Sequence, residues 1–139
     1  TEIAEFMERE IGLEISPRQP FVGRHFNVTR AGIHADGLLK DEEIYNIFDT
    51  AAILNRPATV AVDAHSGLAG IAHWMNSYFR LKGKHQVDKQ DALVVAVKEM
   101  VDDLYESGRN TVMGDEELEI MVRDADPERY ERLLFHKSR

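Results

Sequence analysis

Two neighbouring stretches decide the fold of this chain: SGLAGIAHWMNSYFRLK at residues 66–82 and DKQDALVVAVKEMVDDLYESG at residues 88–108. In both, apolar residues recur three or four positions apart, the spacing that lines one face of an α-helix. Ser66 can cap the first helix, the aspartate pair in DKQD opens the second, and Gly108 ends it. The predicted inward faces are Leu68, Ile71, Ala72, Met75, Tyr78 and Phe79 in the first helix and Ala92, Val95, Met100, Val101 and Leu104 in the second.

Shorter patterns flank these two helices. Prolines and glycines make residues 13–30 a loop or extended arm, and TVAV at residues 59–62 is the only convincing strand. The acidic run DEELE at residues 115–119 is most simply a solvated first helical turn, where the helix dipole favours negative charge. Further helices are expected over residues 2–11, 30–39, 41–48, 115–122 and 127–135.

These patterns predict a mainly α-helical fold with at most one or two short strands. We expect two parts: a helical linker and first subdomain over residues 1–54, and a second helical subdomain over residues 55–139. The length of 139 residues suits a single core, because a chain of about 150 residues buries roughly two thirds of its unfolded surface.

Composition excludes several classes of function. The chain carries 17 Lys and Arg against 25 Asp and Glu, and its net charge of −8 makes nucleic acid an unexpected partner. No apolar run approaches the roughly 18 residues that cross a bilayer, and the acidic first residues do not resemble a signal peptide, so no membrane association is expected. The absence of cysteine excludes disulfides and thiol nucleophiles and suits the cytoplasm, which is the expected location.

Common catalytic and metal-binding fingerprints are absent. The six histidines are never three or four residues apart, so a metal site within this chain is not expected. No P-loop, dinucleotide fingerprint or nucleophile elbow occurs. The aromatic residues Trp74, Tyr78 and Phe79 could stack on a ligand, but their helical spacing favours core packing.

The segment VTRAGIHADGLLKDEEIYNIF at residues 28–48 is dense in titratable groups. His34 and Tyr45 are eleven residues apart, so one straight helix would align them about 16 Å from each other, too far for a shared target. Gly37 allows a bend that brings both to one centre, where an imidazole can transfer a proton and a phenol can donate a hydrogen bond. A packed helical hairpin without chemistry explains the same pattern.

The string AGIHADGLLKDEEIYNIF at residues 31–48 resembles a signature of the 2-isopropylmalate and homocitrate synthase family, in which [SA]-G-I-H-x-D-G-x-L-K precedes a Y-E-I stretch. A second family landmark, a strand followed by H-S-G, is similar to residues 60–67. The resemblance covers residues 20–80 closely and the later helices more loosely. Ala31, Ala35 and Leu68 depart from the isopropylmalate synthase pattern and favour a homocitrate or Re-type citrate synthase.

The resemblance implies the part of a condensing enzyme that follows its TIM barrel, with the barrel itself missing from these residues. Such enzymes join acetyl-CoA to a 2-oxo acid with a divalent metal ion held in the barrel. In a homodimer this part enters the partner's active site, where the resemblance assigns catalysis to His34 and Tyr45. Asp36 is expected either to orient or contact the substrate or to be a solvated carboxylate. The chain alone is then expected to be inactive.

A different class of function stays open beside the enzyme hypothesis. The chain could be a free-standing helical dimerisation module, in which the family-like motif serves packing alone. A barrel encoded before Thr1 would favour the enzyme hypothesis, and an initiator codon there would favour the module.

Overall fold

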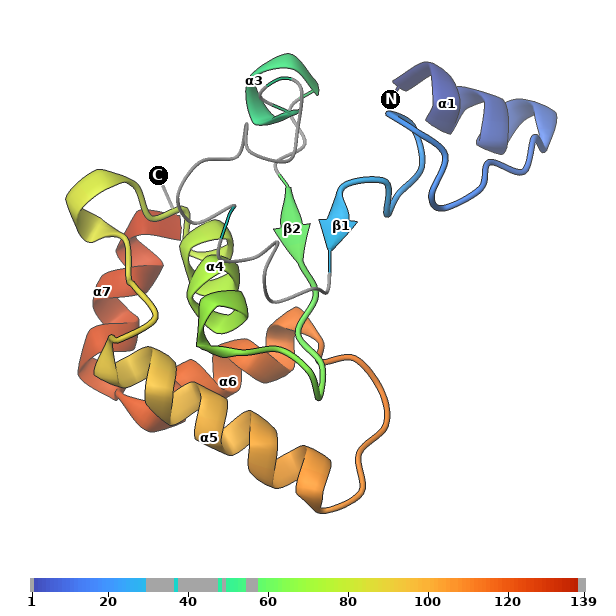
Figure 1. Cartoon of the computed structure of the whole chain (residues 1–139). Helices are drawn as coiled ribbons and strands as arrows, with labels where there is room; N and C mark the ends of the chain where they lie inside the picture. Colours follow the sequence, from blue (N-terminus) through green and yellow to red (C-terminus); the bar gives the residue numbers. More distant parts are fainter. Residues whose placement is uncertain (1, 30–36, 38–47, 49, 55–57, 138–139) are drawn as a thin grey trace.

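The computed structural model describes residues 2–29, 37, 48, 50–54 and 58–137, and it is mainly helical (Figure 1). The prediction of a mainly α-helical chain with at most two short strands is confirmed for these residues. The elements are α1 (Glu2–Phe6), the π-helical turn η1 (Met7–Ile11), β1 (Val28–Thr29), α3 (Thr50–Leu54), β2 (Thr59–Val60), α4 (Leu68–Tyr78), the 3-10 turn η3 (Gly83–His85), α5 (Ala92–Glu106), α6 (Asp115–Ala125) and α7 (Pro127–Lys137).

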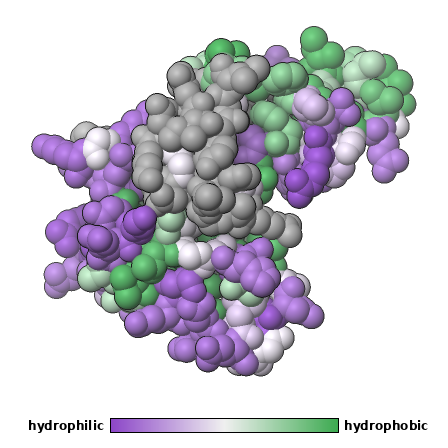
Figure 2. All heavy atoms as spheres, in the orientation of Figure 1, coloured by the Kyte–Doolittle hydropathy of each residue, from purple (hydrophilic) through white to green (hydrophobic). Residues whose placement is uncertain are grey.

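The first predicted helix is present and ends at Gly12, which adopts a left-handed conformation with φ of 69° and donates its N–H to the Met7 carbonyl. The described residues, however, do not cover its apolar side chains, since Ile3, Phe6 and Ile11 are all exposed. Figure 2 shows hydrophobic side chains gathered on the surface at the α1 end of the molecule. Among the described residues, no helix is long and apolar enough to cross a membrane.

Helix α4 forms the centre of the core. Ile71, Ala72, Met75 and Phe79 are completely buried, which confirms the predicted inward face. In Figure 1, α4 lies beside the strand pair, with α5 and α6 beneath it and α7 on its other side. Trp74 is also buried and stacks on the ring of a neighbouring tyrosine, so the assignment of these aromatic residues to packing is confirmed.

Both predicted ends of α4 need correction. Ser66 does not cap the helix, because Gly67 occupies the N-cap position and no side chain bonds there. The helix ends at Tyr78 instead of continuing to residue 82, because Arg80 turns into the left-handed region with φ of 55° and the Leu81 N–H bonds to the Asn76 carbonyl.

The loop after α4 is held by the buried side chain of Asn76. Its amide nitrogen donates to the Val87 carbonyl at 2.9 Å, and its oxygen accepts the Val87 N–H at 2.8 Å. The side chain thus satisfies both backbone groups of one residue, and Val87 is buried beside it. This pairing positions the segment that leads into α5.

Helix α5 begins as predicted, since the Asp91 carboxylate accepts the Leu93 N–H at 2.9 Å. The predicted apolar face is only partly correct. Val101 is buried as predicted, Val95 and Met100 are half-buried, and Ala92 and Leu104 are exposed. The buried residues of α5 are Leu93, Val94, Val97 and Val101.

The acidic first turn of α6 is exposed at Asp115, Glu116 and Glu117, as predicted, but the acidic run also bonds to other helices. Asp115 accepts the indole N–H of Trp74 at 2.9 Å. Glu119 accepts the hydroxyl groups of Tyr130, at 2.8 Å, and Tyr78. These bonds lower the pKa of Glu119, and burial together with Glu119 raises the pKa of Tyr78. The carboxylates therefore join α6 to α4 and α7.

Asp91 also joins the start of α5 to α7. The Arg129 guanidinium donates to both of its carboxylate oxygens, with 2.6 Å between Nη1 and Oδ1. This contact lowers the pKa of the Asp91 carboxyl, and the Leu93 N–H adds to the effect against the opposing influence of burial. The pair is mostly buried, so salt screens it less than a surface pair.

The lowered pKa of Asp91 predicts a specific pH dependence of stability. The ion pair stabilises the fold fully above the unfolded pKa of about 3.9, and this contribution is lost as the pH falls through the lower folded pKa. We expect Asp91→Asn, which keeps a capping oxygen, to be less stable at neutral pH and to lose less free energy of unfolding on acidification. Urea unfolding at about pH 6 and about pH 3 measures this difference.

Asp124→Asn, at a carboxylate with 52% exposure, is the matched control and should behave like the unchanged chain. An identical acid response in Asp91→Asn would contradict the assignment.

Candidate functional site

The three predicted site residues, His34, Asp36 and Tyr45, lie outside the described residues, so their roles stay predictions. Gly37, the proposed bend, is described and buried. The structure also describes Phe48, the last residue of the motif, and its ring stacks on that of Phe21 with 6.0 Å between centroids. The structure therefore describes the chain before the motif, up to Thr29, and the last residue of the motif.

The strand pair joins the residues just before the first family-like motif to the start of the second motif. β1 and β2 are parallel, with Val28 opposite Thr59. The Thr59 N–H donates to the Asn27 carbonyl at 3.1 Å, and the Ala61 N–H donates to the Thr29 carbonyl at 3.0 Å. In the sequence, the first motif begins at Ala31, two residues after Thr29 of β1, and the second motif begins at Val60, the residue of β2 that lies opposite Thr29.

Sequence analysis missed β1, which it placed in a loop or arm. The signal is only two β-branched residues, and their bonding partner lies about thirty residues later in the chain. The TVAV strand was found, but only Thr59–Val60 has strand geometry. The division at residues 54 and 55 stays a prediction.

A compact turn precedes β1 and sets where the strand begins. The Gly23 N–H donates to the Gln19 carbonyl at 2.8 Å, and the His25 N–H donates to the Pro17 carbonyl at 2.6 Å. A Cβ atom on Gly23 would lie 2.5 Å from both the Gln19 nitrogen and the Pro17 oxygen. Only glycine fits at this close approach.

The H-S-G motif forms a hydrogen-bonded turn between β2 and α4. The buried Ser66 hydroxyl accepts the Asp63 N–H at 2.9 Å and donates to the Ala61 carbonyl at 3.3 Å. The Asp63 carboxylate in turn accepts the His65 N–H at 2.9 Å. Ser66 thus has a structural role. His65 is an exposed turn residue.

A cavity of about 340 Å³ lies between the strand pair and helices α4 and α6. Val60, Val62 and Leu118 form its apolar wall, and His25 and Asp115 supply polar groups. Its volume suits a small organic molecule. The Asp115 carboxylate already accepts the Trp74 indole N–H, so His25 is the chemically distinctive group in this wall.

Within the described part of the chain, no three His, Cys, Asp or Glu side chains lie close enough to hold a metal ion. His73 is buried in α4, with 3.4 Å between its Nδ1 and the Ser77 hydroxyl oxygen. A metal ion implied by the resemblance therefore does not fit the described residues, and we assign no step to it there.

Comparisons with known proteins show strong similarity over most of the chain. It is 54% identical over 132 residues to a Citrate (Re)-synthase of Clostridium kluyveri, covering 95% of this chain and 29% of that protein. It is 48% identical over 139 residues to a Citrate (Re)-synthase of Syntrophus aciditrophicus, a match that covers 97% of this chain and 22% of that protein. It is 30% identical over 125 residues to a 2-isopropylmalate synthase of Solidesulfovibrio magneticus, a match that covers 86% of this chain and 22% of that protein. The chain thus spans less than a third of these relatives, and no protein-family model matches it.

The glycine turn before β1 gives a direct mutational test of the strand pair. We expect Gly23→Ala to force the turn open and to lower the free energy of unfolding by about 1 to 3 kcal/mol, the usual cost of overpacking. Gly70→Ala is the matched control, because its Cβ would meet Ser66 Cβ at an ordinary 3.5 Å and should cost nothing. Urea unfolding of both variants measures the difference. Equal stability of the two would show that the close approach at Gly23 does not constrain the fold.

Proposed function

Because the chain belongs to the family of Re-citrate and 2-isopropylmalate synthases, as a homologue of their C-terminal region, we propose that it acts within an enzyme that condenses acetyl-CoA with a 2-oxo acid. The observation that carries this proposal is the 54% identity over 95% of the chain to a Re-citrate synthase. A second Re-citrate synthase at 48% identity favours oxaloacetate as the 2-oxo acid and citrate as the product. The departures from the isopropylmalate pattern at Ala31, Ala35 and Leu68 agree with this choice.

The chemistry requires a proton transfer at an unreactive carbon. A base removes a proton from the methyl group of the acetyl thioester, and that carbon then bonds to the ketone carbon of the 2-oxo acid. The ketone oxygen takes up a proton, and water cleaves the thioester to release free CoA. A divalent metal ion in the barrel of the intact enzyme would supply Lewis-acid polarisation of the ketone.

We assign the proton transfer to His34, acting with a carboxylate from the barrel. An imidazole suits this task, because its ordinary pKa lies near neutral pH. Tyr45 donates a hydrogen bond to the oxygen on which negative charge develops. Asp36 contacts or orients the substrate. In a homodimer these groups act in the partner's active site, a role that rests on the resemblance.

The strand pair supports this assignment from the described part of the chain. Thr29 immediately precedes the motif-bearing segment, and its carbonyl accepts the Ala61 N–H. The chain at Thr29 is therefore held against β2. Val60 of β2 is in turn buried in the core. A catalytic group needs such a fixed support, because small displacements from the productive geometry cost rate.

A second candidate is a helical dimerisation module without catalysis. The exposed apolar side chains of Ile3, Phe6 and Ile11 favour it, since a stripe of this kind is suited to helix pairing. If the chain is only such a module, a longer gene product that contains it has no condensing activity. Release of CoA thiol by such a product would exclude it.

Substitution of His34 tests the proposed mechanism in the complete gene product. We expect His34→Ala to lower kcat by about 10² to 10⁴ fold, the usual effect of losing a general acid or base, while KM for the 2-oxo acid changes little. Tyr45→Phe should lower kcat as well, because it removes the hydrogen-bond donor and keeps the ring. The assay follows free thiol release from acetyl-CoA with oxaloacetate, 2-oxoglutarate or 2-oxoisovalerate. A near-normal rate in folded His34→Ala, judged by circular dichroism, would remove His34 from the mechanism.

A further inference from the structure

The segment after α4 and helix α7 form a positively charged region in an otherwise acidic chain. Residues 80–91 and 127–137 together carry seven Lys and Arg against four Asp and Glu, a balance of +3 in a chain with a net charge of −8. The Asp91 and Arg129 ion pair holds the two segments together. The local charge of this region therefore favours an approaching anion, in contrast to the net charge of the chain.

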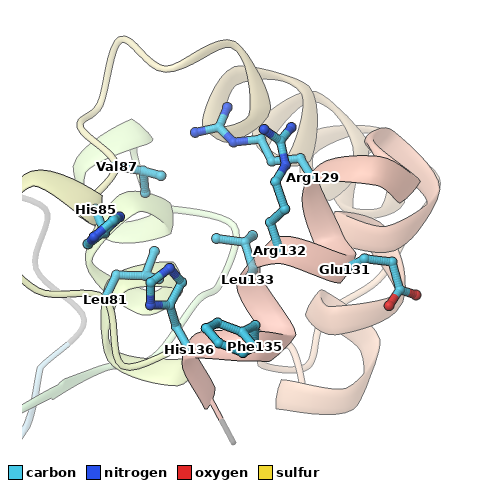
Figure 3. A pocket seen from close by; sticks show the side chains of 9 residues that line it. All are labelled: Leu81, His85, Val87, Arg129, Glu131, Arg132, Leu133, Phe135 and His136. Atoms are coloured by element: carbon cyan, nitrogen blue, oxygen red, sulfur yellow. The ribbon is translucent and has the colours of Figure 1, made fainter. Parts of the chain in front are cut away.

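The same two segments enclose a cavity of about 550 Å³ (Figure 3). Leu81, Val87 and Leu133 line it with buried apolar side chains, and the half-exposed ring of Phe135 lies at its edge. None of these residues lines the cavity beside β1 and β2. The apolar wall provides a surface on which a hydrocarbon or aromatic group can be buried.

Polar groups border the cavity on two sides. Figure 3 shows the guanidinium groups of Arg129 and Arg132 on one side and the imidazoles of His85 and His136 on another, while Glu131 points away. The two imidazoles are in contact, with 4.6 Å between ring centroids, and so join η3 to the end of α7. Donors from two separate segments therefore surround one apolar space.

The two arginines differ in what they can offer a ligand. Arg129 is held by both oxygens of the Asp91 carboxylate, so its charge is already balanced. Arg132 is exposed, and none of the ion pairs among the described residues includes it. A guanidinium without a carboxylate partner presents a planar set of N–H donors that matches a carboxylate or a phosphate.

We propose that this cavity binds a small organic anion that carries an apolar portion, such as an aryl or alkyl carboxylate or phosphate monoester. Arg132 pairs with the anionic group, and the apolar portion packs on Val87 and Leu133. His85 and His136 close the opposite side and supply ring N–H donors. This site does not depend on the condensing activity proposed above, and it goes beyond that activity.

The test uses the 139-residue chain and two probes, benzoate and phenyl phosphate. Both should shift the imidazole proton resonances of His85 and His136 in a saturable manner. Arg132→Ala should weaken binding about tenfold or more, because it removes a charge-assisted hydrogen-bond donor. Arg123→Ala is the matched control, an exposed arginine on α6 that pairs with Asp124, and it should leave the affinity unchanged. The probe that binds with the higher affinity identifies whether the site prefers a carboxylate or a phosphate.

Two further titrations separate the contributions of charge and apolar surface. Benzyl alcohol, which keeps the ring without the charge, should bind much more weakly than benzoate. Inorganic phosphate, which lacks the ring, should bind more weakly than phenyl phosphate. The proposal is overturned if neither aromatic anion shifts the two imidazoles, or if Arg132→Ala and Arg123→Ala weaken binding equally. Equal binding of benzoate and benzyl alcohol, or of phenyl phosphate and inorganic phosphate, also overturns it. None of these readouts depends on the condensing assay, so failure here leaves the proposed function untouched.

Discussion

The parallel pairing of β1 with β2 is the constraint on which the functional part of the structure depends. Two backbone hydrogen bonds, from Thr59 and Ala61, hold the strands in register. An isolated two-stranded pair is marginal in water, so it needs support from packing. Val60 and Val62 are buried, and the Met113 N–H donates to the Val62 carbonyl at 2.9 Å, which joins the strand to the segment before α6. The weak strand pair is thus held by the strong helical core.

The helical core combines apolar burial with polar bonds that fix how the helices meet. Asn76 pairs with the backbone of Val87, and Glu119 accepts hydroxyl groups from α4 and α7. Such groups would be costly if they were left unpaired in the interior. Among the described residues, no buried side-chain nitrogen or oxygen lacks a partner. The satisfied polar contacts therefore select one arrangement of helices from the many that apolar packing alone would allow.

The helices expected over residues 30–39 and 41–48 lie almost entirely outside the described residues, and α3 was not predicted. Local patterns did predict α1, α4, α5, α6 and α7, because apolar spacing and capping residues lie close together in the sequence. They failed where a partner is distant. β1 has only two residues and depends on β2, and the role of Glu119 depends on tyrosines in two other helices. Ser66 has the residue type and position of a helix cap, yet it bonds within the preceding turn. His34, Asp36 and Tyr45 were identified by resemblance, and their geometry lies outside the described residues. The cavity containing Arg132 has no sequence motif, because its histidines come from segments about fifty residues apart.

The central claim is that β1, which precedes the first family-like motif in the sequence, pairs in parallel with β2, in which the second motif begins. Backbone amide hydrogen exchange at Thr59 and Ala61, followed by NMR, tests this claim most directly, because the Thr59 N–H donates to Asn27 directly before β1 and the Ala61 N–H donates to Thr29 within it. The account predicts that both amides exchange far more slowly than the amide of exposed Lys84, since opening them requires loss of the pairing. If the amides of Thr59 and Ala61 exchange as fast as the amide of Lys84, the strand pairing is contradicted. The link that this pairing makes between the chain before the first motif and the start of the second motif is then contradicted as well.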